Sequence, residues 1–360
     1  MSGRFEAPRK KRRLSRRTVI WLCAALASAV LAGVCFGRLH SVSTCLYSQQ
    51  AAERWRGGSD MRFAQVSVFL PVGGETDVQA VETFHESIEQ AMQEVSLEAP
   101  EGGSLYVDAY SGSTQLSVST GHGSANVKTL GVGGDFFTFH PLRLRAGSYL
   151  TADDYMADRV VLDEALAWTL FGSYDVAGQQ VMIGERPYLV AGVVQREDDY
   201  ASRKAYGKDA GMFMSYDALN RISETKIDCY EVVMADPITG YARSVVEKSF
   251  SPDVNLVVEN SARYKLTSLV KVLGDFGERS MQTRAVILPY WENAARLTED
   301  HAALALLLGV LFALCPAGVA GYWAVHWLRK GFGRLRETIP AAIEKKVEAK
   351  KEKNYVRTGI

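Results

Sequence analysis

The chain has 360 residues, and its 41 Lys and Arg balance 41 Asp and Glu, so the formal net charge is zero. That length is enough for one large domain or two ordinary domains with accessory segments. The charge is unevenly spread, because residues 1–17 carry +7, residues 329–360 carry +6 and residues 18–328 carry −13. The ends and the middle are therefore expected to meet different environments, which argues against a uniformly soluble protein.

Two apolar segments lie just inside the basic ends. Residues 18–37 (TVIWLCAALASAVLAGVCFG) and 302–328 contain no Asp, Glu, Lys or Arg. About twenty apolar residues in a helix cover the ~30 Å hydrocarbon core of a bilayer, so we predict a transmembrane helix in each segment. Pro316 would kink the second helix, which a spanning helix tolerates. The positive-inside rule then predicts a multi-pass cell-membrane protein with both termini in the cytoplasm and residues 38–301 outside.

The first apolar segment has two alternative interpretations. A cleaved signal peptide is one, although the apolar core is longer than usual. SRRTVI at 15–20 also resembles a twin-arginine export signal. We favour a retained helix whose basic flank fixes its orientation. On that topology only Cys45 and Cys229 face an oxidising exterior, and the sequence leaves open whether they form a disulfide.

The exterior segment begins with a polar stretch, 38–60, expected to be a stalk or a helical extension. RFAQVSVFL (62–70) is rich in β-branched residues and predicts a strand. Residues 78–95 have apolar side chains at helical spacing and predict a helix capped by Thr76 or Asp77. SLYVDAYSG (104–112) and TQLSVSTG (114–121) are expected to be two further strands.

The strand–helix–strand order returns at 229–260. Strands are predicted at 229–236 and 254–260, with a helix at 241–250 between them. We therefore predict an α+β fold in which residues 62–128 and 228–262 form a split βαβ, ferredoxin-like subdomain. Residues 129–227 would form an inserted, β-rich α+β subdomain, and residues 263–301 a stalk that returns to the membrane.

The stretch 160–194 in the insert reads VVLDEALAWTLFGSYDVAGQQVMIGERPYLVAGVV. After a short strand, Asp163 is a good helix N-cap, and Gly172 suits the left-handed residue after a helix. QQVMI and YLVAGVV, joined by GERP, predict a hairpin. The helix between Asp163 and Gly172 is predicted to bury a broad apolar face made of Ala165, Leu166, Ala167, Trp168, Leu170 and Phe171.

Residues 136–194 resemble the MacB-like periplasmic core domain, a domain of ABC transporter permease-like proteins of the FtsX/MacB type. The family phrase runs Gly-x-Tyr/Phe, then Asp, then Val-Val-Leu, Glu-x-Leu-Ala, Leu-Phe-Gly, Asp-x-x-Gly and a strand pair ending Val-x-Gly-Val-Val. The residues of this sequence that carry the resemblance are Gly147, Tyr149, Asp153 or Asp154, Val160, Val161, Leu162, Asp163, Glu164, Ala165, Leu166, Ala167, Leu170, Phe171, Gly172, Asp175, Gly178, Val190, Gly192, Val193 and Val194.

The resemblance implies an exterior domain of two subdomains that moves when a cytoplasmic ATPase closes. It also implies three further spans after that domain, with an FtsX-like signature between two of them. Here residues 329–360 instead form a Lys- and Glu-rich tail, so we expect the chain to lack the multi-span permease region. The implied partners are membrane lipids, a separate ABC ATPase and a multi-span permease subunit, and a homo-oligomer is left open.

The sequence offers no constellation that predicts catalysis, a cofactor or a metal site, so we expect the chain not to be an enzyme. GVGGDF (131–136) lacks the Lys-Ser/Thr of a phosphate loop. The two acidic pairs at 153–154 and 198–199 could hold calcium, but solvated loop acids are the favoured interpretation. The basic ends flank apolar segments, which indicates a membrane surface and no nucleic acid.

The leading hypothesis is a two-span subunit or accessory of an ABC export or mechanotransmission system, acting through its exterior domain. The alternative is an envelope sensor or organising protein that uses the same exterior fold without an ATPase. An anchored hydrolase is weaker, because no nucleophile–base pair is visible. The tail 329–360 is either a solvated segment near anionic lipid or a docking segment for a cytoplasmic partner.

Overall fold

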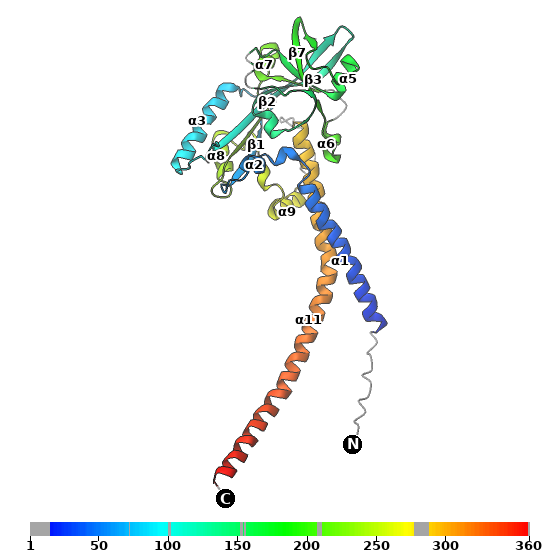
Figure 1. Cartoon of the computed structure of the whole chain (residues 1–360), viewed down its shortest axis with the longest axis vertical. Helices are drawn as coiled ribbons and strands as arrows, with labels where there is room; N and C mark the ends of the chain where they lie inside the picture. Colours follow the sequence, from blue (N-terminus) through cyan, green and yellow to red (C-terminus); the bar gives the residue numbers. More distant parts are fainter. Residues whose placement is uncertain are drawn as a thin grey trace. The chain divides into compact units, whose positions relative to one another are not determined.

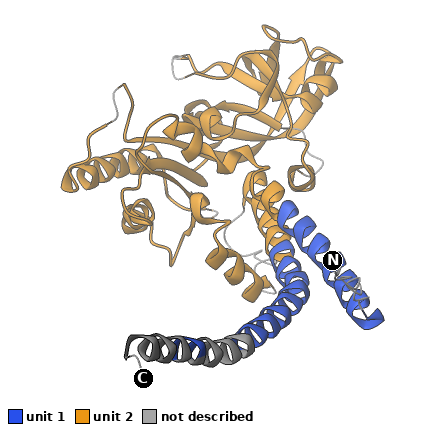
Figure 2. Cartoon of the chain, turned by 60° about the horizontal axis from the view of Figure 1, so that its bottom comes forward, with its two compact units in different colours: residues 1–38, 305–360 blue, residues 39–304 orange. Residues whose placement is uncertain are grey.

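A computed structural model of the chain describes residues 15–71, 73–99, 102–151, 154, 156–206, 211–276 and 288–358 (Figure 1). The chain divides into two compact units (Figure 2). Unit 1 comprises Met1–Arg38 and Ala305–Ile360, and unit 2 comprises Leu39–Leu304. Asp153, one of the two alternatives in the family phrase, lies outside the described residues.

Unit 1 contains most of helix α1 (Arg16–Ser43) and most of helix α11 (Tyr290–Thr358). Both predicted apolar segments are therefore helical, and both helices are long and apolar enough to cross a membrane. α11 continues through Pro316 without a break in its assignment. The two helices contact each other, because the Ser28 hydroxyl donates to the Phe312 carbonyl at 2.6 Å and the Phe36 ring lies against Gly309.

Unit 2 is built on one sheet whose main path is β10-β1-β9-β2-β3-β8-β5-β7-β4, with β6 pairing β2 and β7. With the helices that pack on this sheet, this gives the mixed α+β class that was predicted. The described strands are β1 (Phe63–Phe69), β2 (Tyr106–Thr120), β3 (Gly123–Gly134), β4 (Arg143–Gly147), β5 (Arg159–Asp163), β6 (Gln180–Ile183), β7 (Arg186–Gln195), β8 (Gly211–Ser215), β9 (Cys229–Ala235) and β10 (Leu256–Glu259).

At one end of the sheet, neighbouring strands in the order β10-β1-β9-β2 are antiparallel. Helices α3 (Val78–Glu94) and α8 (Tyr241–Ser249) link β1 to β2 and β9 to β10 and contact each other. Asp77 caps α3 by accepting from the Ala80 amide at 3.2 Å, as predicted. Phe84 of α3 packs edge-on against Tyr230 of β9, with ring centroids 5.3 Å apart. Helix α2 (Ala51–Arg56) also contacts β1 and β9.

The two strands predicted at 104–112 and 114–121 are one strand, β2, so that prediction was wrong. In the sequence, Gly112 and Ser113 look like a break between two strands. In the structure, the chain stays extended through them and pairs with β3. A Cβ at Gly112 would lie 2.4 Å from the Lys226 carbonyl oxygen, so the glycine permits a close approach inside the strand. The first part of β2 pairs with β9, and its last part pairs with β3 and β6.

The rest of the sheet carries α5 (Glu164–Phe171) and α7 (Tyr216–Ser223). Asp163 caps α5 by accepting from the Leu166 amide at 2.7 Å, and Gly172 is left-handed at φ +66°, both as predicted. The predicted apolar face of α5 was too broad. Leu166, Ala167 and Leu170 are buried, but Ala165 and Trp168 are exposed and Phe171 is only half-buried. This helix therefore buries one narrow stripe.

The described segments next to the apolar helices belong largely to unit 2. A 3₁₀ turn, η1 (Tyr47–Gln49), precedes α2, whose Ala51 and Ala52 are buried. On the other side, η2 (Asn260–Ala262) and α9 (Leu266–Gly274) follow β10. The first turns of α11 bury a Trp, alanines and two glutamates, namely Trp291, Glu292, Ala294, Ala295, Glu299, Ala302 and Ala303. Two short helices, α4 (Phe136–Phe139) and α6 (Tyr200–Ala205), complete the unit.

Candidate functional site

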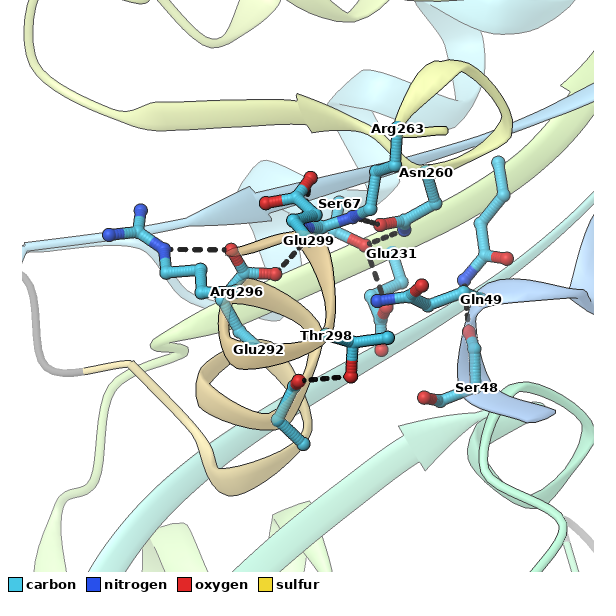
Figure 3. Close-up of polar contacts among 12 residues, drawn as sticks. Ser48, Gln49, Ser67, Glu231, Asn260, Arg263, Glu292, Arg296, Thr298 and Glu299 are labelled. Atoms are coloured by element: carbon cyan, nitrogen blue, oxygen red, sulfur yellow. Dashed lines mark hydrogen bonds and ion pairs between the residues drawn. The ribbon is translucent and has the colours of Figure 1, made fainter. Parts of the chain in front are cut away.

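Three polar side chains lie on strands that are buried along their whole length. β1 and β9 are buried at every residue, yet β1 carries Gln65 and Ser67 and β9 carries Glu231. Burying a polar group without a partner is costly, so each of these side chains needs hydrogen bonds within the protein. The partners they find define the candidate site (Figure 3).

Glu231 joins β1 to the residue after α4. Its Oε1 accepts from the Ser67 hydroxyl at 2.7 Å, and its Oε2 lies 2.5 Å from His140 Nε2. The Asn260 side-chain amide in turn donates to Ser67 Oγ at 2.7 Å. These four buried residues therefore connect α4, β9, β1 and η2 through direct polar contacts.

Arg263 extends this line of contacts to α11. Its Nε donates to Asn260 Oδ1 at 2.7 Å, and its Nη1 lies 3.2 Å from Glu299 Oε1. Its Nη2 pairs with Glu292, whose other oxygen accepts from Arg296 Nε at 3.1 Å. Burial opposes the charge of Arg263, but the carboxylates of Glu292 and Glu299 outweigh that effect and raise the pKa of Arg263. The guanidinium therefore stays charged inside the protein.

We call His140, Glu231, Ser67, Asn260, Arg263, Glu292 and Glu299 the buried polar chain. Both of its ends meet the start of α11. At one end the His140 ring lies 4.3 Å from the Trp291 ring, and at the other Arg263 pairs with Glu292 and Glu299. Removing one partner of a buried ion pair typically costs 3–5 kcal/mol, because the other charge is left unpaired. The first turns of α11 are thus attached to the sheet at two places.

A second set of polar contacts attaches the segment that follows α1. Gln65 Nε2 donates to the Ser48 carbonyl at 2.7 Å, and Gln65 Oε1 accepts from the Ala51 amide at 3.1 Å. The Tyr264 hydroxyl donates to Gln49 Oε1 at 2.7 Å. Residues 48–51 and the first turns of α11 are therefore both held next to β1 by buried or half-buried polar groups.

A cavity of about 180 Å³ lies beside these contacts, and Trp291 and Tyr290 form part of its wall. The Asp163 carboxylate in the wall pairs with Arg196 at 2.5 Å, and Asp228 accepts from the Ser113 hydroxyl at 2.6 Å. Among the residues that the structure describes, no group of three or more His, Cys, Asp or Glu side chains could hold a metal ion. The cavity wall therefore presents ion pairs and aromatic rings, without a recognisable catalytic set.

In each acidic pair considered for calcium, one aspartate has a protein partner. Asp154 Oδ1 lies 3.1 Å from Arg159 Nε. Asp199 caps α6 by accepting from the amides of Ala201 and Ser202 at 2.9 and 3.0 Å. Cys45 and Cys229 are both free thiols, the first exposed and the second buried, so the disulfide left open by the sequence does not occur in this structure.

The family-phrase residues lie in and around the insert and do not belong to the buried polar chain. Gly147 and Gly192 are paired across β4 and β7, where a Cβ at Gly192 would lie 2.4 Å from the Ser148 carbonyl oxygen. Tyr149 donates to the Leu142 carbonyl and stacks on Phe137 at 4.6 Å between ring centroids.

The remaining phrase residues also have local packing roles. Asp163 accepts from the Gly211 amide at 2.6 Å as well as capping α5, and Glu164 lies 3.4 Å from Arg145. Leu166, Ala167 and Leu170 lie in the core under the insert, with Phe171 at its edge. Asp175 is exposed, and Gly178 takes φ +86° while its amide donates to the Val190 carbonyl at 2.8 Å.

The buried polar chain was not predicted from the sequence. Its partners are far apart in sequence, with 164 positions between Ser67 and Glu231 and 193 between Ser67 and Asn260. One signal was present, because Gln65, Ser67 and Glu231 interrupt strands that otherwise read as apolar. Strands covered on both faces must bury such residues.

Together these features define a membrane-anchored α+β domain flanked by two helices that can cross a bilayer. The chain belongs to the MacB-like periplasmic core domain family, whose model matches residues 50–251. The resemblance expected from residues 136–194 is thereby confirmed.

Curated relatives carry related segments. The macrolide export ATP-binding/permease protein MacB of Chromobacterium violaceum is 34% identical over 93 residues, which is 25% of this chain and 14% of that protein. The protein of the same name from Agrobacterium fabrum is 33% identical over 100 residues, or 26% of this chain and 15% of that protein. The matched part of this chain therefore spans well under a fifth of the length of these relatives.

Among solved structures, the periplasmic region of MacB from Actinobacillus actinomycetemcomitans is similar, with 18% identity and a TM-score of 0.41. The match covers 59% of this chain and 95% of that one.

Proposed function

We propose that this chain is a permease-like subunit or accessory of an ABC export or mechanotransmission system, and that it acts through its exterior domain. Family membership supports the proposal, since the domain family matches residues 50–251 and the relatives named above are called ATP-binding/permease proteins. The two helices that can cross a membrane, α1 and α11, flank that domain in the sequence.

The observation that carries the mechanical part of the proposal is the attachment of α11 to the sheet. α11 is one helix from Tyr290 to Thr358, and its first turns hold the buried polar chain through Glu292 and Glu299. A movement of the second span along its axis would reach β1 and β9 through Arg263, Asn260 and Ser67. Rigid elements joined by buried polar contacts are suited to carry such coupling.

In the proposed topology both termini are cytoplasmic, since residues 1–17 and 329–360 are basic. Residues 38–301 would then be extracytoplasmic, with residues 62–128 and 228–262 as a split βαβ subdomain and 129–227 as its insert. The strand order β10-β1-β9-β2 supports that division. The sequence contains no Gly-x-x-x-x-Gly-Lys-Ser/Thr run, so ATP hydrolysis is assigned to a separate chain.

The experiment is affinity purification of the full chain from native membranes in mild detergent, followed by mass spectrometry. We expect an ATP-binding chain and a multi-span permease chain to be recovered with it. A variant that ends at Leu328 tests the cytoplasmic tail, which as a docking segment should be needed for recovery of the ATPase.

Two outcomes would count against the proposal. Repeated recovery of the chain without any ATP-binding or permease protein would favour the alternative, an envelope sensor or organising protein. ATP hydrolysis by the purified chain alone would contradict the assignment of the ATPase to another chain.

A further inference from the structure

The two helices of unit 1 enclose a groove of about 770 Å³. α1 lines it with Arg17, Thr18, Trp21 and Leu22. Toward the N-terminal end of α1 the two helices separate, and both views show this opening (Figures 1 and 2). Deeper along α1 they are in contact, at Ser28 with Phe312 and at Phe36 with Gly309.

α11 contributes one continuous stripe to the groove. Leu314, Gly318, Tyr322 and His326 recur at intervals of four, which places them on one face of the helix. A Cβ built at Gly318 meets no atom within 4 Å, so the groove is open at that point. The step from Leu314 to His326 covers about 18 Å of helix, a little more than half of the ~30 Å hydrocarbon core. The groove therefore has the length of one leaflet.

One end of this groove is basic. Arg17 lines it, Arg16 precedes that residue, and Arg329 and Lys330 follow His326 on α11. No Asp or Glu occurs in residues 7–52 or 301–336 that would balance these charges locally. Near a membrane surface each Lys or Arg contributes about 1 kcal/mol of attraction to anionic lipid. Trp21 and Tyr322 lie along the same groove and are residue types that favour the headgroup level.

We infer that this groove is a binding site for one anionic glycerophospholipid. An acyl chain lies along the apolar stripe past Gly318, and the headgroup phosphate is paired with Arg17 beside His326. The inference rests on the proposed membrane insertion and not on any ABC partner. It can therefore be tested on the purified chain, and failure to recover an ATPase leaves it unaffected.

The test is native mass spectrometry of the full chain after equilibration with vesicles of equal parts phosphatidylglycerol and phosphatidylcholine. We expect one phosphatidylglycerol to be retained in preference to phosphatidylcholine by roughly tenfold. Gly318→Leu, which fills the groove, should lose this adduct. Gly321→Leu is the matched control, since a Cβ there also meets no atom within 4 Å and Gly321 does not line the groove.

A second pair of variants tests the headgroup contact. Arg17→Gln should reduce retention of phosphatidylglycerol clearly more than Arg16→Gln, which makes the same change in charge one residue away but outside the groove lining. Equal retention by the Gly318→Leu and Gly321→Leu variants would overturn the inference, as would equal retention of the two lipids by the wild type. Loss of a co-purifying membrane protein from Gly318→Leu, with lipid retention unchanged, would assign the groove to a partner helix instead.

Discussion

Arg263, just after η2, and Glu292, in the first turn of α11, form an ion pair whose side chains are only 3% and 2% exposed. Glu299 lies about two helical turns further along α11, on the same face, and pairs with the same guanidinium. One arginine therefore holds two turns of this helix, and Asn260 and Ser67 connect it to the sheet. Function and stability should both depend on it.

Arg263→Met should destabilise unit 2 by about 3–5 kcal/mol, because it removes the buried guanidinium that pairs with both Glu292 and Glu299. The matched control is Arg243→Met, which removes the exposed pair with Glu247 on α8 and should cost no more than about 1 kcal/mol. Urea unfolding of residues 39–304, followed by circular dichroism, measures both. Equal midpoints for the two variants would show that the buried pair does not hold α11.

Leu170→Ala should lower the free energy of unfolding by about 2–5 kcal/mol, since Leu170 is 1% exposed in the core under the insert. Phe171→Ala should lower the free energy of unfolding clearly less, because Phe171 packs only at the edge of that core. Thermal melts of the same fragment compare the two. A larger loss for Phe171→Ala would mean that α5 is rotated relative to the arrangement described.

The His85–Asp108 pair should make stability depend on pH. His85 Nε2 lies 2.5 Å from Asp108 Oδ2, and this hydrogen bond raises the pKa of His85 although partial burial opposes it. A raised folded-state pKa stabilises the fold fully below the unfolded value and loses that contribution as pH rises through the folded value. His85→Gln should therefore lower the unfolding midpoint more at about pH 5.5 than at about pH 9.

The control for that comparison is His122→Gln, because His122 is exposed in the turn between β2 and β3. An exposed side chain contributes little to stability, so this substitution should change the unfolding midpoint only slightly. If His85→Gln also produced the same change at both values, the pair with Asp108 would not titrate in this range.

Topology can be tested with the chain's own thiol. Cys45 is exposed and free, so an impermeant maleimide should label it from outside on intact cells or spheroplasts. The thiol is partly desolvated although the residue is exposed, and this desolvation, with the nearby charge of Asp199, raises the pKa of Cys45, so labelling should be slow near neutral pH and faster as pH rises. A cysteine placed at Thr358 in a Cys45→Ser background should react only after permeabilisation. Its labelling on intact cells would contradict the proposed orientation.

Local features of the fold were predictable from the sequence. The cap at Asp163 and the left-handed Gly172 each depend on atoms a few residues away, so residue type and order suffice. The family phrase was recognisable for a similar reason. Close backbone approaches such as that of Gly147 and Gly192 restrict the residue type at each position.

Features set by distant contacts were not predictable. Gly112 resembled a strand break because its role depends on the Lys226 carbonyl, more than a hundred residues away. The side of α5 that faces the core depends on where the sheet lies, so Trp168 was wrongly assigned to it. The buried polar chain needs five separate segments to meet, and periodicity in one strand carries no information about that meeting.

We propose that ATP use on a partner chain reaches the exterior domain through α11 and Arg263. Spin labels at Trp168→Cys and Ile238→Cys, both exposed positions in unit 2, would report on that domain in the complex recovered from membranes, in a Cys45→Ser background. We expect the label-to-label distance to change when ATP is added, and we expect Arg263→Met to suppress the change while the partners remain bound. An unchanged distance on addition of ATP, in a complex that hydrolyses it, would contradict the claim.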